Sequence, residues 1–269
     1  MSRFHAPQIR KTILDMAFAG STVHIGCAFS IVELLAVLYR HHLRCEANNP
    51  DDASRDYLVL SKGHGVMTQY ACLRELGWLS DEDLAQYFKN GSRLKGLADA
   101  HVPGVEATTG SLGHGLSVGV GLAMGAKLKR TDQVCYTLVG DGELNEGSIW
   151  EAAMFAAHFK LDNLIVIVDQ NGFQAMGRTD EVMGLGSIEA KFQAFGFDAV
   201  TIDGHDEQAV DRAYADMKNR RNGKPKAIVA RTVKGKGVSF MEDDNIWHYT
   251  RLTPDNHAKA VREVTTHET

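Results

Sequence analysis

Two stretches of sequence decide the fold: residues 134–147 read VCYTLVGDGELNEG and residues 164–171 read LIVIVDQN. Each begins with a continuous apolar run, at 134–139 and at 164–168, that is bounded by turn residues. Such runs are typical of parallel strands that are buried on both faces of a sheet. The segment 149–158 between them has the length and composition of a crossover helix. We therefore predict two neighbouring parallel strands joined by a helix.

A polar motif follows each of these strands. Gly140-Asp141-Gly142 comes directly after the first, and Asn171 lies 30 positions beyond Asp141, at the end of the second. Adjacent parallel strands would bring Asp141 and Asn171 side by side. A carboxylate and an amide oxygen, with phosphate oxygens completing the shell, suit Mg²⁺. An ordinary strand-to-helix turn would explain the GDG motif alone, but it does not account for Asn171 at this spacing.

The rest of the chain continues the alternation of strands and helices. We predict further strands at 57–60, 199–202 and 227–230, and helices at 30–42, 80–88, 112–129 and 206–220. Ser30 and Glu33 have the spacing of a capping box, as does Ser80 with an acidic residue three positions on. The pattern predicts a single α/β domain, residues 1–269, with an open, mainly parallel sheet and helices on both faces. Ligands of such sheets bind at the carboxyl ends of the strands, where the polar motifs lie.

Composition narrows the class of protein. The hydrophobic content of 44% and charged content of 23% are those of an ordered globular protein, and the net charge of -5 with scattered basic residues argues against a nucleic-acid partner. Residues 1–10 lack the apolar segment of an export signal, and no apolar run approaches the ~20 residues that span a membrane. The four cysteines form no CxxC pair, so we expect reduced thiols and a cytoplasmic location.

Several motifs together resemble those of one enzyme family. The GDG…N pair is similar to the thiamine-diphosphate signature, and Ser61-Lys62-Gly63-His64 to the SxGH loop of transketolases. Residues 103–115, PGVEATTGSLGHG, resemble the PGVExTTGxLGxG segment of transketolases. Residues 23–26, VHIG, and residues 234–240, KGKGVSF, followed by Trp247-His248, match further elements in family order. The chain thus resembles a transketolase over nearly its whole length, which implies the thiamine-diphosphate-binding fold.

The resemblance implies which residues bind the cofactor. Asp141, Asn171 and the main-chain carbonyl of Phe173 would hold Mg²⁺ or another divalent cation. The remaining contacts to thiamine diphosphate would come from the following residues: Gly142 and His64 at the diphosphate, Lys234 and His248 as positive charges beside it, Gly110 and Leu112 through main-chain groups at the aminopyrimidine, and Ser111 and Glu143 next to these.

It also implies catalytic roles. His24, His64 and His248 would line the channel over the thiazolium and exchange protons with sugar hydroxyls. Glu146 would couple two active sites across a shared interface. A histidine that grips the donor sugar in transketolases is replaced here by Leu97. Either that contact is missing, or His101 has taken it over. We expect structural roles for His41, His205 and His257.

Length is the last departure, because transketolases are more than twice as long as these 269 residues. We expect a second subunit of about 300 residues that carries the pyrimidine-binding domain, a heterotetramer with two copies of each chain, and sugar or sugar-phosphate substrates. The α subunit of a 2-oxo acid dehydrogenase shares the metal motif, but not the SKGH and KGKG…WH elements. A 1-deoxyxylulose-5-phosphate synthase would be one long chain. A non-catalytic regulatory subunit would not need intact Asp141, Asn171, His64 and His248.

Overall fold

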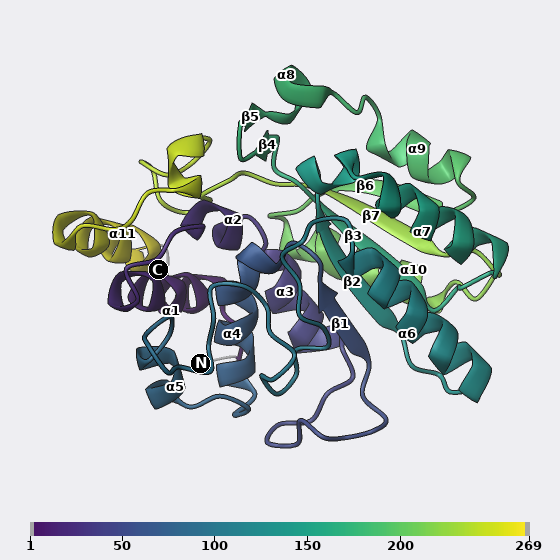
Figure 1. Ribbon diagram of the computed structural model, residues 1–269, viewed down its shortest axis with the longest axis horizontal. Helices are drawn as coiled ribbons and strands as arrows, with labels where there is room; N and C mark the ends of the chain where they lie inside the picture. The colour runs from purple at the N-terminus through teal and green to yellow at the C-terminus, as the bar shows by residue number, and fades with distance from the viewer. Residues whose placement is uncertain (1–2, 267–269) are drawn as a thin grey trace.

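A five-stranded parallel sheet forms the centre of the computed structural model, which describes residues 3–266 (Figure 1). The strands follow the order β1-β2-β3-β7-β6. Their bounds are β1 Tyr57–Leu60, β2 Cys135–Gly140, β3 Leu164–Gln170, β6 Asp198–Asp203 and β7 Lys226–Arg231. β2 and β3 are neighbours, and Gly140 pairs with Asp169 in their register. The two polar motifs therefore lie side by side at the carboxyl edge, as the sequence predicts.

Helices cover both faces of this sheet, which confirms the predicted fold class. The α-helices are α1 Ala6–Ala19, α2 Ile25–Phe29, α3 Val32–Val37, α4 Val66–Glu75, α5 Asp81–Ala85, α6 Gly115–Lys129, α7 Gly147–His158, α8 Thr179–Met183, α9 Ile188–Ala194, α10 Glu207–Asn219 and α11 Pro254–Thr266. The short elements are η1 Leu38–His42, η2 Gly63–Gly65, η3 Gly142–Asn145, η4 Asn245–His248 and the hairpin strands β4 Phe173–Gln174 and β5 Gly177–Arg178.

The two faces of the sheet differ in thickness. α6, α7 and α9 cover one face in a single layer, whereas α3 and α10 cover the other with α1, α4 and α11 outside them (Figure 1). Alternating strand residues divide between the two cores: Leu58 and Leu60 join the thicker side and Val59 the thinner one. Burial on both faces explains why the strands are continuous apolar runs.

Glycine lets α6 approach the sheet closely. A Cβ atom at Gly119 would clash with the Thr137 hydroxyl oxygen on β2. A larger residue there would push the helix away from the strand. The loop before α6, which carries residues 110–113, is thereby held next to the ends of β1 and β2.

The predicted helix at 30–42 differs from the structure. α3 begins only at Val32, with Ile31 as a cap residue that makes no side-chain hydrogen bond, and a π-helical turn follows. The capping box of Ser30 and Glu33 is therefore wrong. The Ser30 hydroxyl donates to Asp169 at 2.7 Å, and Glu33 pairs with Arg10. Long-range partners thus engage both side chains, and the only local contact of the Ser30 hydroxyl in the described residues is the Cys27 carbonyl at 3.2 Å.

Other boundaries agree more closely with prediction. Ser80 and Asp83 form a capping box at the start of α5, which ends at Ala85 instead of residue 88. α6, α7 and α10 fall within three residues of their expected ends. Neither α1 nor α11 was predicted from the sequence, and these two helices pack against each other.

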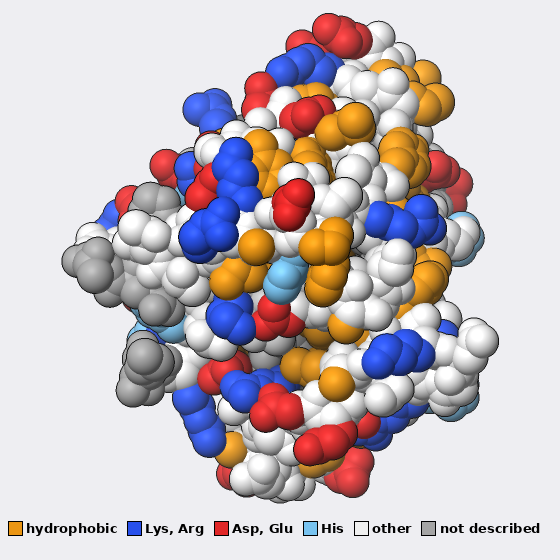
Figure 2. Space-filling model, turned by 90° about the vertical axis from the view of Figure 1, so that its left-hand side faces the viewer, with side chains coloured by type: hydrophobic (Ala, Val, Ile, Leu, Met, Phe, Trp, Pro, Cys, Tyr) orange, Lys and Arg blue, Asp and Glu red, His pale blue; other side chains and the backbone are white. Residues whose placement is uncertain are grey.

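The surface beside α1 and α11 mixes acidic, basic and apolar side chains (Figure 2). Basic side chains are scattered over this face, in agreement with the sequence pattern. All four cysteines are free, as predicted. Within residues 3–266, no helix combines the length and apolar character needed to cross a bilayer.

Candidate functional site

A cavity of about 520 Å³ opens at the carboxyl edge of β1, β2 and β3. Loops after these strands, together with α2 and η4, bring most of the predicted site residues to its wall. They are His24, His64, Gly110, Leu112, Asp141, Gly142, Glu143, Glu146, Asn171, Phe173 and His248. Ser111, Lys234 and His101 are the predicted residues that do not line it.

Asp141 and Asn171 define a carboxylate end of this cavity. The Asp141 carboxylate accepts hydrogen bonds from the backbone N–H groups of Gly142, at 2.8 Å, and Gly172, at 2.7 Å. The Asn171 amide nitrogen donates to Asp169 at 2.8 Å, which turns its oxygen the other way, where the Phe173 N–H donates to it. Both side chains are buried and their orientations are fixed.

Asp169 lies behind this end and was not assigned a role from the sequence. One of its carboxylate oxygens accepts from Lys62, at 2.5 Å, from Ser30 and from Asn171, and the other accepts from Thr232. Burial favours the neutral form of Asp169, but the Lys62 charge and these hydrogen bonds outweigh it and lower the pKa of Asp169. The buried pair Lys62–Asp169 therefore anchors the metal motif. In the sequence, Asp169 could have been found as the acidic residue two positions before Asn171.

These residues fit a divalent cation. Burial raises the pKa of Asp141 to about 7, and the nearby Asp169 charge raises it too. Within residues 3–266, Asp141 has no hydrogen bond to a cationic side chain, so a buried carboxylate is left uncompensated. No group of three or more His, Cys, Asp or Glu in these residues could hold a metal by itself. Asp141, the Asn171 amide oxygen and the Phe173 carbonyl would supply hard oxygen ligands, with phosphate oxygens completing the set.

Three histidines define the opposite, histidine end. The ring centroids of His24, His64 and His248 lie 5.1 to 5.7 Å apart. Burial lowers the pKa of each ring, and the charges of Lys62 and Lys234 lower it further. The pKa of His248 falls to about 3. All three rings are therefore neutral at pH 7, so that each can donate one hydrogen bond and accept another.

Lys234 lies behind the histidine end and not at the open cavity. Its ammonium nitrogen is 3.0 Å from Nδ1 of His248 and 2.6 Å from Oδ1 of Asn245. The side chain is buried, with 1% of the residue exposed, and it passes over the Phe173 ring. The structure therefore gives Lys234 a contact with His248. The positive charge that the resemblance implies for Lys234 and His248 beside the diphosphate stays a prediction, and burial lowers the pKa of His248 in this structure.

A buried ion pair secures the loop that carries Lys234. Arg10 binds Glu33 through two nitrogens, at 2.7 and 2.9 Å, and donates from Nε to the Lys236 carbonyl at 2.7 Å. Glu33 also contacts Nδ1 of His205, whose Nε2 accepts the Val233 N–H at 2.8 Å. We call Arg10, Glu33 and His205 the loop clamp. The structural role expected for His205 is thus present.

Glu143 lines the cavity, but its carboxylate is engaged by the protein. It accepts from the Ser61 hydroxyl at 2.5 Å and from the N–H groups of Gly113, at 2.8 Å, and Gly140, at 3.1 Å. It thereby ties the loop with Gly110, Ser111 and Leu112 to the ends of β1 and β2. The structure thus gives Glu143 a bracing role, and its predicted cofactor contact stays a prediction.

Leu97 and His101 are placed differently. Leu97 lines the cavity, is 42% exposed and approaches Gly110. His101 points away, with a side chain that is 91% exposed and bonded to Asp99. Of the two alternatives from the sequence, the geometry favours a missing donor contact, because an apolar side chain occupies the position and His101 does not reach it.

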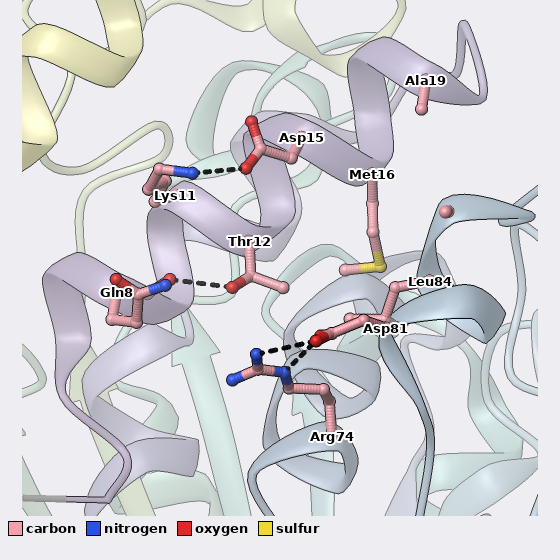
Figure 3. Close-up of a pocket in the computed structure, with 10 residues that line it drawn as sticks. Gln8, Lys11, Thr12, Asp15, Met16, Ala19, Arg74, Asp81 and Leu84 are labelled. Carbon is pink, nitrogen blue, oxygen red and sulfur yellow. Dashed lines mark hydrogen bonds and ion pairs between the residues drawn. The ribbon is translucent and has the colours of Figure 1, made fainter.

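A second pocket, of about 330 Å³, lies between α1 and α5 (Figure 3). Its charged side chains are already paired: Lys11 with Asp15 and Arg74 with Asp81, each at 2.7 Å. None of the predicted site residues lines it. The cavity at the sheet edge, with its unpaired Asp141, is therefore the candidate site.

An open parallel sheet with this edge cavity defines an α/β protein of the thiamine-diphosphate-binding class. Comparison with known families gives the particular member: the chain belongs to the family described as "Transketolase, thiamine diphosphate binding domain", which it matches over residues 3–268.

Similar proteins and solved structures indicate the same family. The chain is 41% identical to a subunit of the apulose-4-phosphate transketolase of Phocaeicola vulgatus, over 95% of this chain and 90% of the relative. It is 40% identical to the 6-deoxy-6-sulfo-D-fructose transketolase subunit SqwG of Clostridium sp., over 95% and 93%. The transketolase structure of Campylobacter jejuni superposes with a TM-score of 0.90 at 32% identity, over 97% of this chain and 42% of that one. The chain thus spans about two fifths of the solved transketolases that it matches.

Proposed function

We propose that this chain is the thiamine-diphosphate-binding subunit of a transketolase that moves a two-carbon ketol unit from a ketose donor to an aldose acceptor. The observation that carries the proposal is the pairing, in one cavity, of a carboxylate end with hard oxygen ligands and an end of three neutral histidines. Relatives named as transketolase subunits, matched over 90% and 93% of their length, support the same interpretation.

Each part of the cavity has a distinct task in this proposal. Mg²⁺, held by Asp141, Asn171 and the Phe173 carbonyl, would fix the diphosphate, and thiamine diphosphate supplies a carbanion centre at its thiazolium. The loop with Gly110, Ser111 and Leu112 would offer main-chain groups to the aminopyrimidine. His24, His64 and His248 would hydrogen-bond the oxygens of the sugar, since each neutral ring has one N–H donor and one acceptor nitrogen. The cavity wall would exclude water from these steps.

Apolar side chains at the mouth of the cavity support a second subunit. Met176, Val182 and Met183 line the mouth, and Met176 is 77% exposed. Exposed apolar patches at a site usually mark a surface that another polypeptide covers. The names of the related subunits imply such a partner. We propose that it brings the pyrimidine-binding domain and closes the cavity.

The outer surface of α6 and α7 supports a heterotetramer. Leu128 on α6, with Met154 and Phe155 on α7, are exposed there beside an apolar groove. Glu146, at the start of α7, is exposed and also lines the cavity, so it joins this surface to the site. We propose that two copies of the chain meet at this surface. A cytoplasmic location belongs to the proposal as well.

The substrate class is a sugar or sugar phosphate. The names of the two relatives share a sugar with an anionic group, a phosphate in one and a sulfo group in the other. Leu97 gives this cavity an apolar patch beside Gly110, where a hydroxyl of the sugar would find no hydrogen-bond partner from this side chain. We therefore propose a donor with an anionic end and few polar contacts at Leu97.

Reconstitution tests the function. The purified chain is combined with a second chain of the transketolase C-terminal type from the same source, thiamine diphosphate and Mg²⁺, and assayed with a ketose phosphate and an aldose. We expect ketol transfer only in the complete mixture. Asp141→Ala should weaken Mg²⁺-dependent cofactor binding by at least about 100-fold in calorimetry, because Asn171 and one carbonyl cannot hold the ion.

Two results would overturn the proposal. Decarboxylation of a 2-oxo acid without ketol transfer would assign the chain to the dehydrogenase α subunits. Substantial ketol transfer by the unpartnered chain would remove the need for a second subunit. An unchanged cofactor affinity in Asp141→Ala would refute the metal assignment alone.

A further inference from the structure

The contacts of His248 determine which of its ring nitrogens carries a proton. Nδ1 lies 3.0 Å from the Lys234 ammonium and 3.5 Å from the Cys27 sulfur. An ammonium has three N–H donors and no acceptor, so its partner must offer a lone pair. In the described part of the chain, Nε2 of His248 has no hydrogen-bond partner. The neutral ring can satisfy Lys234 only with its proton on Nε2.

Asn245 supports the direction of this hydrogen bond. Its amide nitrogen donates to the carbonyls of Gln174, at 3.1 Å, and Ala175, at 3.4 Å. Its oxygen therefore faces Lys234, which it contacts at 2.6 Å. Lys234 thus meets two acceptors, Oδ1 of Asn245 and Nδ1 of His248, and both hydrogen bonds have the lysine as donor.

We propose that Lys234 is a positioning residue that holds His248 in the Nε2–H tautomer, so that His248 presents a proton donor to ligand in the cavity. The inference deepens the proposed function. Only the catalytic role of His248 rests on that function; the tautomer does not. Lys234 acts through His248, because its nitrogen lies behind the cavity wall. His248 then serves as a neutral hydrogen-bond donor to an oxygen of the cofactor or sugar, and not as a cation.

The surroundings of Lys234 leave it little freedom to make another contact. A Cβ atom at Gly26 would lie 3.1 Å from Cγ of Lys234, so the glycine on α2 makes room for the lysine stem. The Gly235 N–H donates to the Gly26 carbonyl at 3.1 Å. On the other side of Lys234, the loop clamp holds Val233 through His205. The backbone is therefore fixed on both sides of the positioning residue.

Histidine tautomers can be read directly from nitrogen NMR. The full chain is labelled with ¹⁵N-histidine, and His248 is assigned by the signals that vanish in His248→Gln. We expect an unprotonated Nδ1 and a protonated Nε2 for His248 in the wild-type chain. A protonated Nδ1 in the wild-type spectrum would overturn the proposal, whatever the variants do.

Two lysines of the same loop give a matched pair of variants. Lys234→Met keeps the length of the stem and removes the donor, so His248 should exchange between tautomers and its two nitrogen shifts should converge. Lys236→Met, at a half-exposed residue paired with Glu242, should leave the His248 signals unchanged. Cys27→Ala should also keep the tautomer, because a thiol is a weak partner. A His248 spectrum in Lys234→Met identical to wild type would overturn the proposal.

Lys234→Arg tests whether the effect of Lys234→Met comes from the lost hydrogen-bond donor or from a folding defect. An arginine also has only donors, so the tautomer should be restored. In the reconstituted holoenzyme we expect Lys234→Met to lower kcat by about 100-fold with KM little changed, the size of the loss of one preorganised hydrogen-bond donor. A loss confined to KM would assign Lys234 to substrate binding instead. The tautomer measurement needs no ketol transfer, so its failure and that of the proposed function are distinguishable.

Discussion

The two ends of the cavity shift the pKa values of their side chains in opposite directions. Burial raises the pKa of Asp141 to about 7 at the carboxylate end and lowers the pKa of His248 to about 3 at the histidine end. In both cases burial favours the uncharged form of the group. Only the carboxylate end has hard oxygen ligands, so only there would a bound cation restore the charge. One cavity can therefore suit a metal at one end and hold neutral, hydrogen-bonding histidines at the other.

Each end is held by its own buried ion pair. Lys62–Asp169 lies directly behind Asn171 at the carboxylate end. Arg10–Glu33 acts on the histidine end from a distance, through the backbone of the loop that carries Lys234. The first pair supports side chains and the second supports a loop. Breaking each pair in turn shows whether the two ends are independent.

The largest effect is expected at the carboxylate end. Lys62→Met would leave Asp169 buried without its cation, and breaking such a pair costs about 3–5 kcal/mol. We expect the free energy of unfolding in denaturant to fall by that amount and Mg²⁺-dependent cofactor affinity to fall with it. Lys226→Met, at a lysine that pairs with Asp198 far from the cavity, is the control that should spare the affinity. A stable Lys62→Met chain would show that Asp169 is neutral or compensated elsewhere.

A somewhat smaller effect is expected from acid at the loop clamp. Burial alone would raise the pKa of Glu33, but the Arg10 charge and the hydrogen bonds from His205 and Arg10 lower it from 4.5 to about 2. A depressed pKa contributes stability that is present above pH 4.5 and is lost as the pH falls toward 2. At 1.36 kcal/mol per unit this amounts to roughly 3 kcal/mol.

Denaturation curves between about pH 6 and pH 3 measure this contribution. Glu33→Gln should be less stable than wild type at the upper end of this range and should lose less stability on acidification. Parallel pH dependence of the two proteins would show that Glu33 keeps its ordinary pKa and does not serve the clamp.

The smallest effect is expected outside both ends. His101 is exposed and bonded to Asp99, so His101→Ala should change kcat/KM for ketose donors by less than about twofold, as surface substitutions usually do. Steady-state kinetics of the reconstituted enzyme measures it. A clear loss of kcat/KM with unchanged cofactor binding would place His101 at the donor sugar after all, by a rearrangement on complex formation.

Local and periodic features of the fold could be predicted from the sequence. Continuous apolar runs placed β2 and β3 as neighbours, and the spacing of Asp141 and Asn171 placed both at one edge of the sheet. α1 escaped prediction, because its buried residues, such as Ile13 and Leu14, are mixed with basic and polar ones. Its position depends on contacts with α4 and α11, which no local pattern contains.

For the site residues as well, local features could be predicted from the sequence and long-range contacts could not. Most residues in recognisable motifs line the cavity, but their partners could not be inferred from the sequence. Ser30 and Glu33 have the local spacing of a capping box, yet each is engaged by residues more than 20 positions away. For Lys234 the resemblance implies a positive charge beside the diphosphate, and the sequence does not reveal that His248 accepts its hydrogen bond. Buried charges find partners through the tertiary fold, and sequence spacing does not encode them.

The loop clamp also bears on the order of folding. Arg10 and the Lys236 carbonyl, which it contacts, are separated by 226 positions, whereas the strands that carry Asp141 and Asn171 are joined by one short helix. Contacts of long sequence separation close slowly, because the chain between them must first be ordered. Asp141 and Asn171 can therefore come together within a local unit, before their Lys62–Asp169 anchor, which spans 107 positions, is in place. The loop with Lys234 is completed only after α1 has docked. Protection of the Val233 amide from solvent exchange is accordingly a marker of a fully folded chain, and a chain can have a native sheet before its histidine end is competent.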